Sequence, residues 1–333
     1  MTTSVEDTTA TAPGRQDAPA SRRRRLTLLL PWVVLAVIYA FTVTQSPGYL
    51  KAAQLGSLLQ LITILATVAI GQLGVILVGG IDLSVSTVMT FANMMSAGLL
   101  AGQDGNLAAA IGLPLAVGAV TGLLNGLIIT KLGVPDMIAT LATMTIMLGA
   151  GYLYTGGAPK GGSSPGLTAF VTHRIGGLVT PATIAWLVIA AVVMMALRGT
   201  IFGRKVYAVG LSGGAARAAG ISETRTRIGL YVISGTFAAA AGVLLTGYTG
   251  SSFLGSGDPY QLMSIAAVVL GGASIFGGSG GYGNTIAGVA IITLLLSVLQ
   301  VIGIPTAGQD ILYGVVIIVM LILFRFSGSR EAR

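Results

Sequence analysis

Ten apolar runs, each about as long as a membrane-spanning helix, dominate this 333-residue sequence. A helix needs about 20 consecutive apolar residues to cross the hydrocarbon core of a bilayer. Only 8% of the residues are charged, against about 25% in an average soluble domain. Because so few charges cannot cover a water-facing surface, the sequence predicts an all-α integral membrane protein.

The predicted spans are separated by polar segments and by glycine and proline, which interrupt helices. Gly79-Gly80 follows the second run, and Gly133-Val134-Pro135 separates the fourth run from the fifth. The ten predicted spans cover residues 28–45, 55–79, 84–101, 107–130, 136–155, 180–198, 228–249, 261–277, 284–302 and 309–325.

The basic residues provide a test of this count, because the cytoplasmic loops of membrane proteins carry most of the Lys and Arg. If the arginine run at 22–25 is cytoplasmic and the spans alternate, 15 of the 18 basic residues fall on the cytoplasmic side. Lys51, Lys160 and Arg174 fall on the opposite side. The charges therefore favour about ten spans with both termini in the cytoplasm, and their placement argues against nucleic-acid binding.

The two ends of the chain are polar. Residues 1–25 combine Thr, Ala, Pro and Asp with the arginine run, which predicts a disordered, basic cytoplasmic tail. Residues 327–333 are interpreted as a second cytoplasmic tail. The sequence between them, 26–326, is interpreted as one transmembrane domain.

The sequence lacks the residues that most kinds of catalytic site require. The sequence has no cysteine and a single histidine, His173, which excludes thiol chemistry and argues against a metal site. Residues Leu211 to Gly214 read Leu-Ser-Gly-Gly, as in the signature of ABC-transporter ATPases, but no Gly-x-x-x-x-Gly-Lys-Ser/Thr phosphate loop occurs. We therefore predict that the chain is not an ATPase or another enzyme and uses no metal or cofactor.

The longest and most basic segment predicted on the cytoplasmic side is 199–227, between the sixth and seventh spans. Its alanine-rich middle, interrupted by glycines, predicts one or two short helices. A lipid-binding helix carries bulky apolar residues on one face, whereas small residues suit a helix that fits closely into a groove of another protein. Docking onto a partner protein is therefore favoured over anchoring to anionic lipid.

Four stretches carry motifs in a characteristic order: 79–97 (GGIDLSVSTVMTFANMMSA), 125–157, 203–222 (GRKVYAVGLSGGAARAAGIS) and 265–288. Together they resemble the membrane subunits of bacterial ribose- and xylose-type ABC importers, over about residues 55 to 325. The family's cytoplasmic loop usually reads Asn-Pro-Glu-Ala-Ala-Arg. This chain has Ser212 to Arg217 there, with Gly214 in place of the glutamate.

The resemblance implies a type II ABC importer-like helical bundle in the bacterial plasma (inner) membrane. It also implies a second permease subunit, two ABC ATPase domains on the cytoplasmic side and a soluble sugar-binding protein on the other side. The loop at 203–222 would lie in a groove of the ATPase. The candidate coupling residues are Arg204, Ala215, Ala216, Arg217, Gly220 and Glu223.

Polar residues within or beside the apolar runs are candidates for a solute pathway. A carboxylate at the bilayer centre costs about 2.5–3.5 kcal/mol on insertion scales, so an acid there requires an explanation. Asp82 and Ser84 either cap the third span or belong to a pathway or gate. The deeper asparagines and threonines either connect helices or line the pathway. The candidate pathway or gate residues are Asp82, Ser84, Asn93, Asn125, Thr140 and Thr143.

These features predict the permease subunit of an ATP-driven importer of a neutral monosaccharide, a pentose such as ribose or xylose, delivered by an extracytoplasmic binding protein. Scattered hydroxyl and amide groups suit a solute that has many hydroxyls and no charge. The alternative is an ion-coupled secondary transporter that uses Asp82, Asp136 or Asp310. Such transporters place their acids at mid-membrane on discontinuous helices, whereas these three acids lie at predicted span ends.

Overall fold

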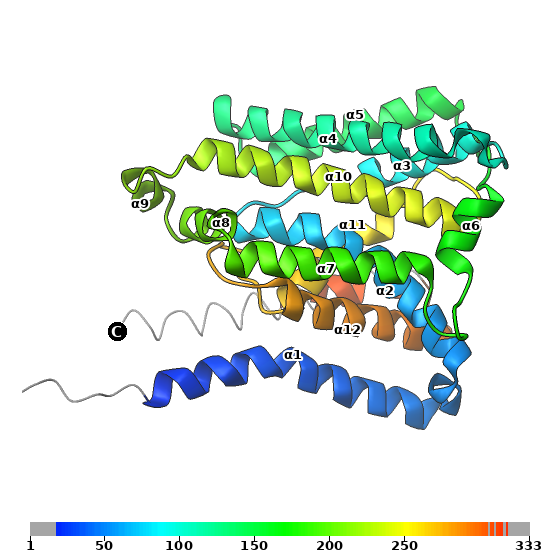
Figure 1. Ribbon diagram of the computed structural model, residues 1–333, viewed down its shortest axis with the longest axis horizontal. Coiled ribbons are helices and arrows are strands. Elements are labelled where there is room, and N and C mark those ends of the chain that lie inside the picture. Colours follow the sequence, from blue (N-terminus) through cyan, green and yellow to red (C-terminus); the bar gives the residue numbers. More distant parts are fainter. Residues whose placement is uncertain (1–17, 306, 310, 316–317, 319–333) are drawn as a thin grey trace, which may run out of the picture.

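The computed structural model of the protein describes residues 18–305, 307–309, 311–315 and 318, and these are almost entirely helical (Figure 1). Within them, β-structure is limited to two isolated bridges. The α-helices are α1 (Ala18–Gln45), α2 (Ala52–Leu77), α3 (Val85–Leu100), α4 (Leu107–Lys131), α5 (Asp136–Thr155), α6 (Pro165–Thr172), α7 (Pro181–Gly199), α8 (Ile201–Leu211), α9 (Gly213–Ala218), α10 (Glu223–Thr249), α11 (Asp258–Leu270) and α12 (Tyr282–Val301).

The predicted all-helical membrane fold is confirmed. Among the described residues, six helices are long and apolar enough to cross a membrane: Ala52–Leu77, Asp104–Lys131, Asp136–Thr155, Pro181–Gly199, Glu223–Thr249 and Tyr282–Val301. Leu29–Gln45 and Val85–Leu100 are shorter apolar helices. These eight helices coincide with eight of the ten predicted spans. The tenth span, 309–325, and Asp310 lie largely outside the described residues.

The eighth predicted span, 261–277, differs from the structure. Helix α11 ends at Leu270, and a non-helical segment leads from Gly271 to Gly281 before α12 begins. Gly272, Gly277 and Gly278 in this segment have positive φ angles, which an L side chain rarely adopts. The apolar run is continuous in sequence, but its glycines end the helix after 13 residues.

The two ends of the chain fall only partly within the described residues. Helix α1 begins at Ala18, so residues 18–25 of the predicted N-terminal tail, with the arginine run, are helical. The remainder of that tail, 1–17, and the predicted C-terminal tail, 327–333, lie outside the described residues. The short helix α6, which the sequence analysis did not predict, lies at the opposite end of the molecule from α8 and α9 (Figure 1).

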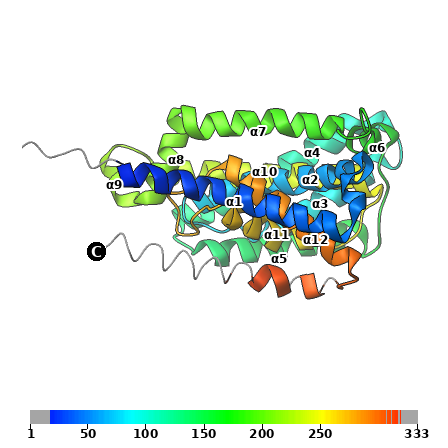
Figure 2. The same cartoon turned by 90° about the horizontal axis from the view of Figure 1, so that it is seen from below.

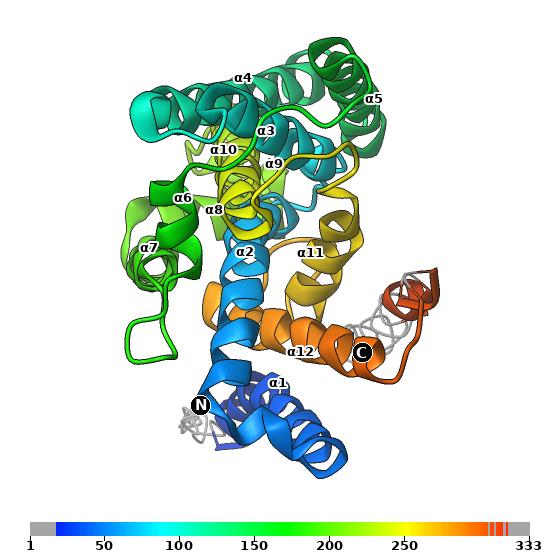
Figure 3. The same cartoon turned by 90° about the vertical axis from the view of Figure 1, so that its right-hand side faces the viewer.

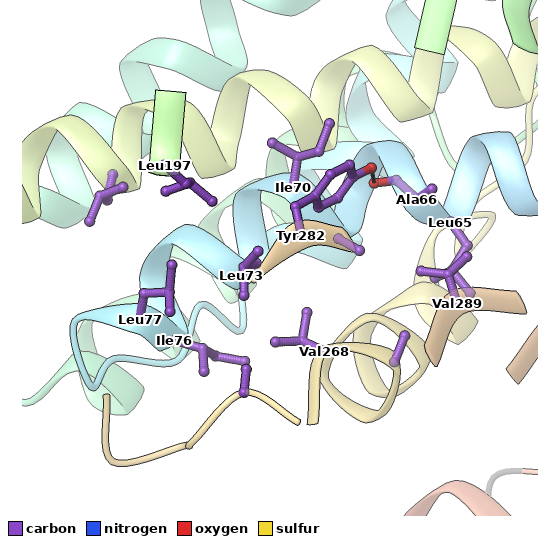
Figure 4. Packing of buried hydrophobic residues seen from close by; sticks show 14 of the residues in the cluster. Leu65, Ala66, Ile70, Leu73, Ile76, Leu77, Leu197, Val268, Tyr282 and Val289 are labelled. Carbon is purple, nitrogen blue, oxygen red and sulfur yellow. Dashed lines mark hydrogen bonds between the residues drawn. The ribbon is translucent and has the colours of Figure 1, made fainter. Parts of the chain in front are cut away.

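Figure 3 views the bundle from one end. Helix α2 occupies its centre, with α3 and α10 on one side and α11 and α12 on another. Of its apolar window, 83% is buried, against 28% for α4, α5 and α7. A helix that is apolar on all sides is expected in the interior of a bundle. Tyr282 at the start of α12 shows how α2 is held: its hydroxyl donates to the Ala66 carbonyl oxygen at 2.8 Å (Figure 4). The same hydroxyl accepts from Trp186 Nε1 of α7 at 2.8 Å.

Helices α4 and α10 approach each other closely because small residues line their contact. A methyl group added at Gly122 would overlap the carbonyl oxygen of Tyr231, and one added at Gly118 would overlap that of Gly235. Glycines four residues apart on one helix face allow such backbone contact between membrane helices. The abundance of glycine in the apolar runs therefore has a direct packing role here.

The outer helices expose apolar side chains. Helix α7 runs along one flank of the bundle and α5 along the other (Figure 2). Val188 on α7 is 60% exposed and Ile146 on α5 is 69% exposed. Apolar side chains on outward faces suit contact with lipid or with another membrane subunit.

Candidate functional site

The segment between α2 and α3, residues 78–84, brings Asp82 into the interior of the bundle. Asp82 is only 1% exposed. Its Oδ1 accepts hydrogen bonds from the Ser84 backbone N (3.0 Å) and hydroxyl (2.6 Å), and its Oδ2 accepts from the Ser234 hydroxyl of α10 (2.7 Å). A buried carboxyl group is tolerated when donors satisfy its oxygens, and these three donors do so.

Ser84 continues this network to α4 and α5. Asn125 Nδ2 donates to Ser84 Oγ at 2.9 Å, and Thr143 Oγ1 donates to Asn125 Oδ1 at 2.5 Å. One turn earlier on α5, Thr140 Oγ1 donates to backbone oxygens, including that of Ile81 at 3.4 Å. Five of the six candidate pathway residues thus belong to one buried cluster, which we call the Asp82 network. Its members are Asp82, Ser84, Asn125, Thr140, Thr143 and Ser234.

The sixth candidate, Asn93, lies in a separate cluster further along α3. Its Nδ2 donates to Thr246 Oγ1 of α10 at 2.9 Å, and its Oδ1 accepts from Ser256 Oγ at 3.1 Å. Asn93 is fully buried. It therefore connects α3 to α10 and to the segment before α11.

All six candidates have hydrogen-bond partners within this chain and are less than a tenth exposed. In this conformation they connect helices, and a solute could reach them only after some of these bonds open. Ser84 is the N-cap residue of α3 but its side chain makes no capping bond; Asp82 instead accepts from the Ser84 backbone N. That N–H belongs to the N-cap residue itself and not to the first turn of α3, so neither the Asp82 nor the Ser84 side chain caps the helix in this structure.

The sequence analysis missed Ser234, although it donates to Asp82. The signal for it lies in the spacing on α10: Arg227, Tyr231 and Ser234 are at positions i, i+4 and i+7, which share one helix face. A serine within an apolar run carries no functional signal of its own. Its role depends on the packing of that helix face against the 78–84 segment.

The basic segment 199–227 forms two short helices, α8 and α9, at one end of the molecule (Figure 1). Each helix begins at a residue whose hydroxyl accepts from a backbone N–H: Thr200 for α8, Ser212 for α9 and Ser222 for α10. Such caps stabilise helix starts by about 0.5–2 kcal/mol each. Three caps within about 25 residues explain why this polar segment is helical rather than irregular.

The candidate coupling residues differ in exposure. Arg204, Ala215, Arg217 and Gly220 are exposed, while Ala216 packs into the molecule and is 3% exposed. Gly220 has a φ of 76° just after α9, and the next N–H, of Ile221, donates back to the Ala216 carbonyl oxygen at 2.9 Å. This is a common glycine-dependent helix ending.

Glu223 is the centre of an ion-pair network. One carboxylate oxygen, Oε2, pairs with Nη1 of Arg217, and the other, Oε1, lies 3.2 Å from Nε of Arg227. Arg227 Nη1 lies 3.5 Å from Asp136 Oδ2 at the start of α5, the position predicted for Asp136. Arg227 Nη2 also donates to the Val78 carbonyl oxygen at 3.1 Å.

Helix α8 lies directly against the end of α2. A methyl group added at Gly210 would overlap the Leu77 carbonyl oxygen, which also accepts from Gly278 N at 2.9 Å. Tyr207, one turn earlier, donates from its hydroxyl to the Gly280 carbonyl oxygen at 2.8 Å. Burial raises the pKa of Tyr207, so its hydroxyl remains a donor. The end of α2, α8 and the glycine-rich segment 271–281 thus form one contact.

A groove of about 490 Å³ lies elsewhere, between α4, α6, α7 and α10. Its walls are apolar, with Thr67 as a rare polar side chain, so it does not suit a solute rich in hydroxyls. In the described part of the chain, no cluster of three His, Cys, Asp or Glu side chains could hold a metal ion.

A helical bundle with buried polar clusters and apolar outer faces defines a multi-pass membrane protein, and comparison with known proteins specifies its family. Residues 54–324 match the family model described as branched-chain amino acid transport system / permease component. The chain belongs to this permease family. It is a multi-pass protein of the bacterial plasma membrane.

The curated relatives are permease proteins and cover most of the chain. It is 36% identical over 298 residues to the ribose import permease protein RbsC of Bacillus subtilis (89% of this chain, 92% of the relative). It is 33% identical over 317 residues to the galactose/methyl galactoside import permease protein MglC of Escherichia coli K12 (90% and 94%). A probable ABC transporter permease protein, y4mJ of Sinorhizobium fredii, is 30% identical over 335 residues (99% and 99%). No solved structure gives a significant match.

Proposed function

We propose that this chain is the permease subunit of an ATP-driven importer of a neutral monosaccharide, with a pentose such as ribose or xylose as the first candidate. The names of the relatives, which include ribose and galactose permeases, support a sugar. The family description names branched-chain amino acids, which are zwitterions. The candidate pathway residues are mainly hydroxyl and amide groups, which suit a neutral solute better.

The partners follow from the same proposal. Two ABC ATPase domains bind at the cytoplasmic end, a soluble sugar-binding protein delivers the solute at the other end, and a second permease subunit completes the pathway. The observation that carries this proposal is the exposure of basic and small residues at the end of the bundle formed by α8 and α9. There Arg204, Ala215 and Arg217 are exposed, as a docking surface for another protein requires.

The proposed topology has ten spans with both termini in the cytoplasm. The six long apolar helices and two shorter ones support eight of these spans. The distribution of Lys and Arg supports the orientation. In this arrangement residues 26–326 form the transmembrane domain, and the 199–227 segment faces the cytoplasm.

Uptake by reconstituted vesicles tests the proposed function. The chain is combined with an ABC ATPase and a soluble sugar-binding protein of the ribose-import type, and labelled ribose, xylose, galactose and leucine are offered. We expect ATP-dependent accumulation of a sugar only when all components are present. Accumulation of leucine in preference to every sugar would contradict the proposed substrate class.

A second candidate function, an ion-coupled transporter, is favoured by one observation. Asp82 is a buried carboxyl group on the non-helical segment between α2 and α3, and secondary transporters bind their coupling ions at interrupted helices. Vesicles that contain this chain alone, with a proton or sodium gradient imposed, separate the two functions. Sugar accumulation under these conditions would support ion coupling and contradict dependence on ATP.

A further inference from the structure

We propose that Arg227 is a positioning residue that connects helix α9 to the Asp82 network by holding the end of α2. This inference rests on the proposed function, because it assigns to Arg227 the transfer of movement from the ATPase-facing end to the buried polar residues. The candidate coupling residues do not include Arg227, although one of them, Glu223, is its ion-pair partner.

Two other parts of the chain, the end of α2 and the start of α5, meet at the guanidinium group of Arg227, which also pairs with Glu223 on its own helix. Nη2 donates to the carbonyl oxygen of Val78, the residue that follows α2, at 3.1 Å. Nη1 faces Asp136 Oδ2 at 3.5 Å, and Nε lies 3.2 Å from Glu223 Oε1. A planar guanidinium group can serve several acceptors in fixed directions, which a lysine ammonium group on a flexible chain does less well.

The two arginines that pair with Glu223 differ in exposure. The side chain of Arg227 is 23% exposed, whereas that of Arg217, on the other side of Glu223, is 65% exposed. Exposed ion pairs contribute little, about 0–1 kcal/mol. Arg217 pairs with Glu223 and is also accessible to a partner protein, while Arg227 serves contacts inside this chain.

The helix face that carries Arg227 continues to the Asp82 network. Tyr231 is one turn further along α10 and is fully buried. A methyl group added at Gly80 would collide with both the Tyr231 hydroxyl and the Asp136 carboxylate. Two turns from Arg227, the Ser234 hydroxyl donates to Asp82. One face of α10 therefore contacts the 78–84 segment from its start to Asp82.

Helix α8 also contacts the end of α2, through Gly210. Leu77 receives the close approach of Gly210, and Val78 receives the hydrogen bond from Arg227. The last carbonyl groups of a helix lack intrahelical partners: that of Leu77, beside Gly210, accepts from Gly278 N, and that of Val78 accepts from Arg227. Displacement of α9 relative to the membrane helices would act on the end of α2 through α8 on one side and through Glu223 and Arg227 on the other.

The primary experiment compares Arg227→Gln with Arg225→Gln in the full chain. Arg225 is exposed and on the same turn of α10, so the control removes the same charge from the same helix end. Amide hydrogen exchange of residues 78–84 is followed in the purified protein. We expect exchange to be about tenfold faster in Arg227→Gln, as the loss of a hydrogen bond to a charged group implies, and unchanged in Arg225→Gln. Equal exchange in the two variants would overturn the proposal.

A second readout separates positioning from general stability. In vesicles with the ATPase and binding protein, sugar uptake per ATP hydrolysed is measured for both variants. We expect Arg227→Gln to lower this ratio by roughly twofold to thirtyfold, the range of effects on coupling between sites, while ATP hydrolysis itself persists. A ratio equal to that of Arg225→Gln would overturn the coupling role.

Arg227→Lys covers the case in which Arg227→Gln does not fold. Lysine keeps the charge beside Asp136 and Glu223 but cannot contact all three acceptors, so we expect exchange and uptake ratio between those of the wild type and Arg227→Gln. Values equal to wild type would overturn the need for a guanidinium group. If wild-type vesicles show no ATP-dependent uptake, the proposed function fails, whereas hydrogen exchange still decides whether Arg227 holds the end of α2.

Discussion

At the scale of single residues, the interior of this protein is organised by a small number of polar side chains. Asp82 is the clearest example, because a carboxyl group at 1% exposure depends on its donors. Those donors come from its own segment and from α10. The Asp82 network therefore fixes the positions of four separate parts of the chain relative to one another.

Ser234→Ala is predicted to destabilise the protein. The change removes a donor to a buried carboxyl group, and leaving a buried acceptor without its partner costs about 1–3 kcal/mol. Thermal unfolding in detergent measures the effect. Thr236→Ala is the matched control, because within the described part of the chain the Thr236 hydroxyl bonds only to the Val232 carbonyl oxygen of its own helix. Equal losses in the two variants would show that the Asp82 contact contributes nothing of its own.

Asp82→Asn tests whether the network needs both oxygen acceptors of the carboxyl group. An asparagine keeps the shape of the side chain but has one oxygen acceptor where the carboxyl group has two. Ser84 and Ser234 therefore cannot both keep the hydrogen bonds that they donate to Asp82. We expect lower uptake by the assembled importer, with the chain still folded. Uptake at the wild-type level would show that the carboxyl group is not required in the transport cycle.

At the scale of helices, close approach and capping determine the arrangement. Gly118 and Gly122 let α4 contact the backbone of α10, and hydroxyl caps begin each helix of the 199–227 segment. The sequence predicted short helices in that segment, and the structure contains two. Their lengths could not be predicted, because they depend on which residues of the segment contact the end of α2.

Gly122→Ala and Gly112→Ala are predicted to have opposite effects. A methyl group at 122 would overlap the Tyr231 carbonyl oxygen, whereas one at 112, on the same helix, meets nothing within 4 Å. Overpacking costs about 1–3 kcal/mol, while replacing an unconstrained helical glycine by alanine gains up to about 1 kcal/mol in water. Unfolding midpoints of the two variants should therefore move down and up, respectively. A neutral Gly122→Ala would show that α4 and α10 can separate freely.

Arg217→Gln is predicted to weaken binding of the ATPase. The side chain is exposed on α9 and pairs only with Glu223 among the described residues, so its loss has little effect on the fold. Arg204→Gln on α8 provides a comparison, since Arg204 is also exposed. Pull-down of the ATPase with each variant measures the contribution of each arginine. Wild-type binding by both variants would remove these residues from the docking surface.

At the scale of the whole molecule, the sequence predicted the fold class and eight of its apolar helices well. Apolar length decides these features, and they need no knowledge of tertiary contacts. The prediction of a span at 261–277 missed the break after Leu270, because glycine carries no polar side chain that would interrupt an apolar run, although it ends the helix. The candidate pathway residues were chosen for polarity alone. Their division into the Asp82 network and the Asn93 cluster depends on packing between helices distant in sequence.

The proposed topology predicts which ends of the molecule face which side. Because the chain has no cysteine, single substitutions report on access without background. Leu211, the last residue of α8, is 75% exposed. Lys51 is exposed and immediately precedes α2, which begins at the end of the molecule opposite α8 and α9 (Figure 1). Leu211→Cys should react with a membrane-impermeant maleimide only from the cytoplasmic side, and Lys51→Cys only from outside. Labelling of Leu211→Cys from outside would reverse the orientation.

The deep burial of α2 has a consequence for how the surroundings affect this protein. Changes in bilayer thickness or lipid composition act first on helices with large outward faces, such as α5 and α7. Helix α2 touches protein along most of its length, so the bilayer reaches it only indirectly. Its conformation should therefore follow that of its neighbouring helices, and stay nearly the same when one lipid is exchanged for another.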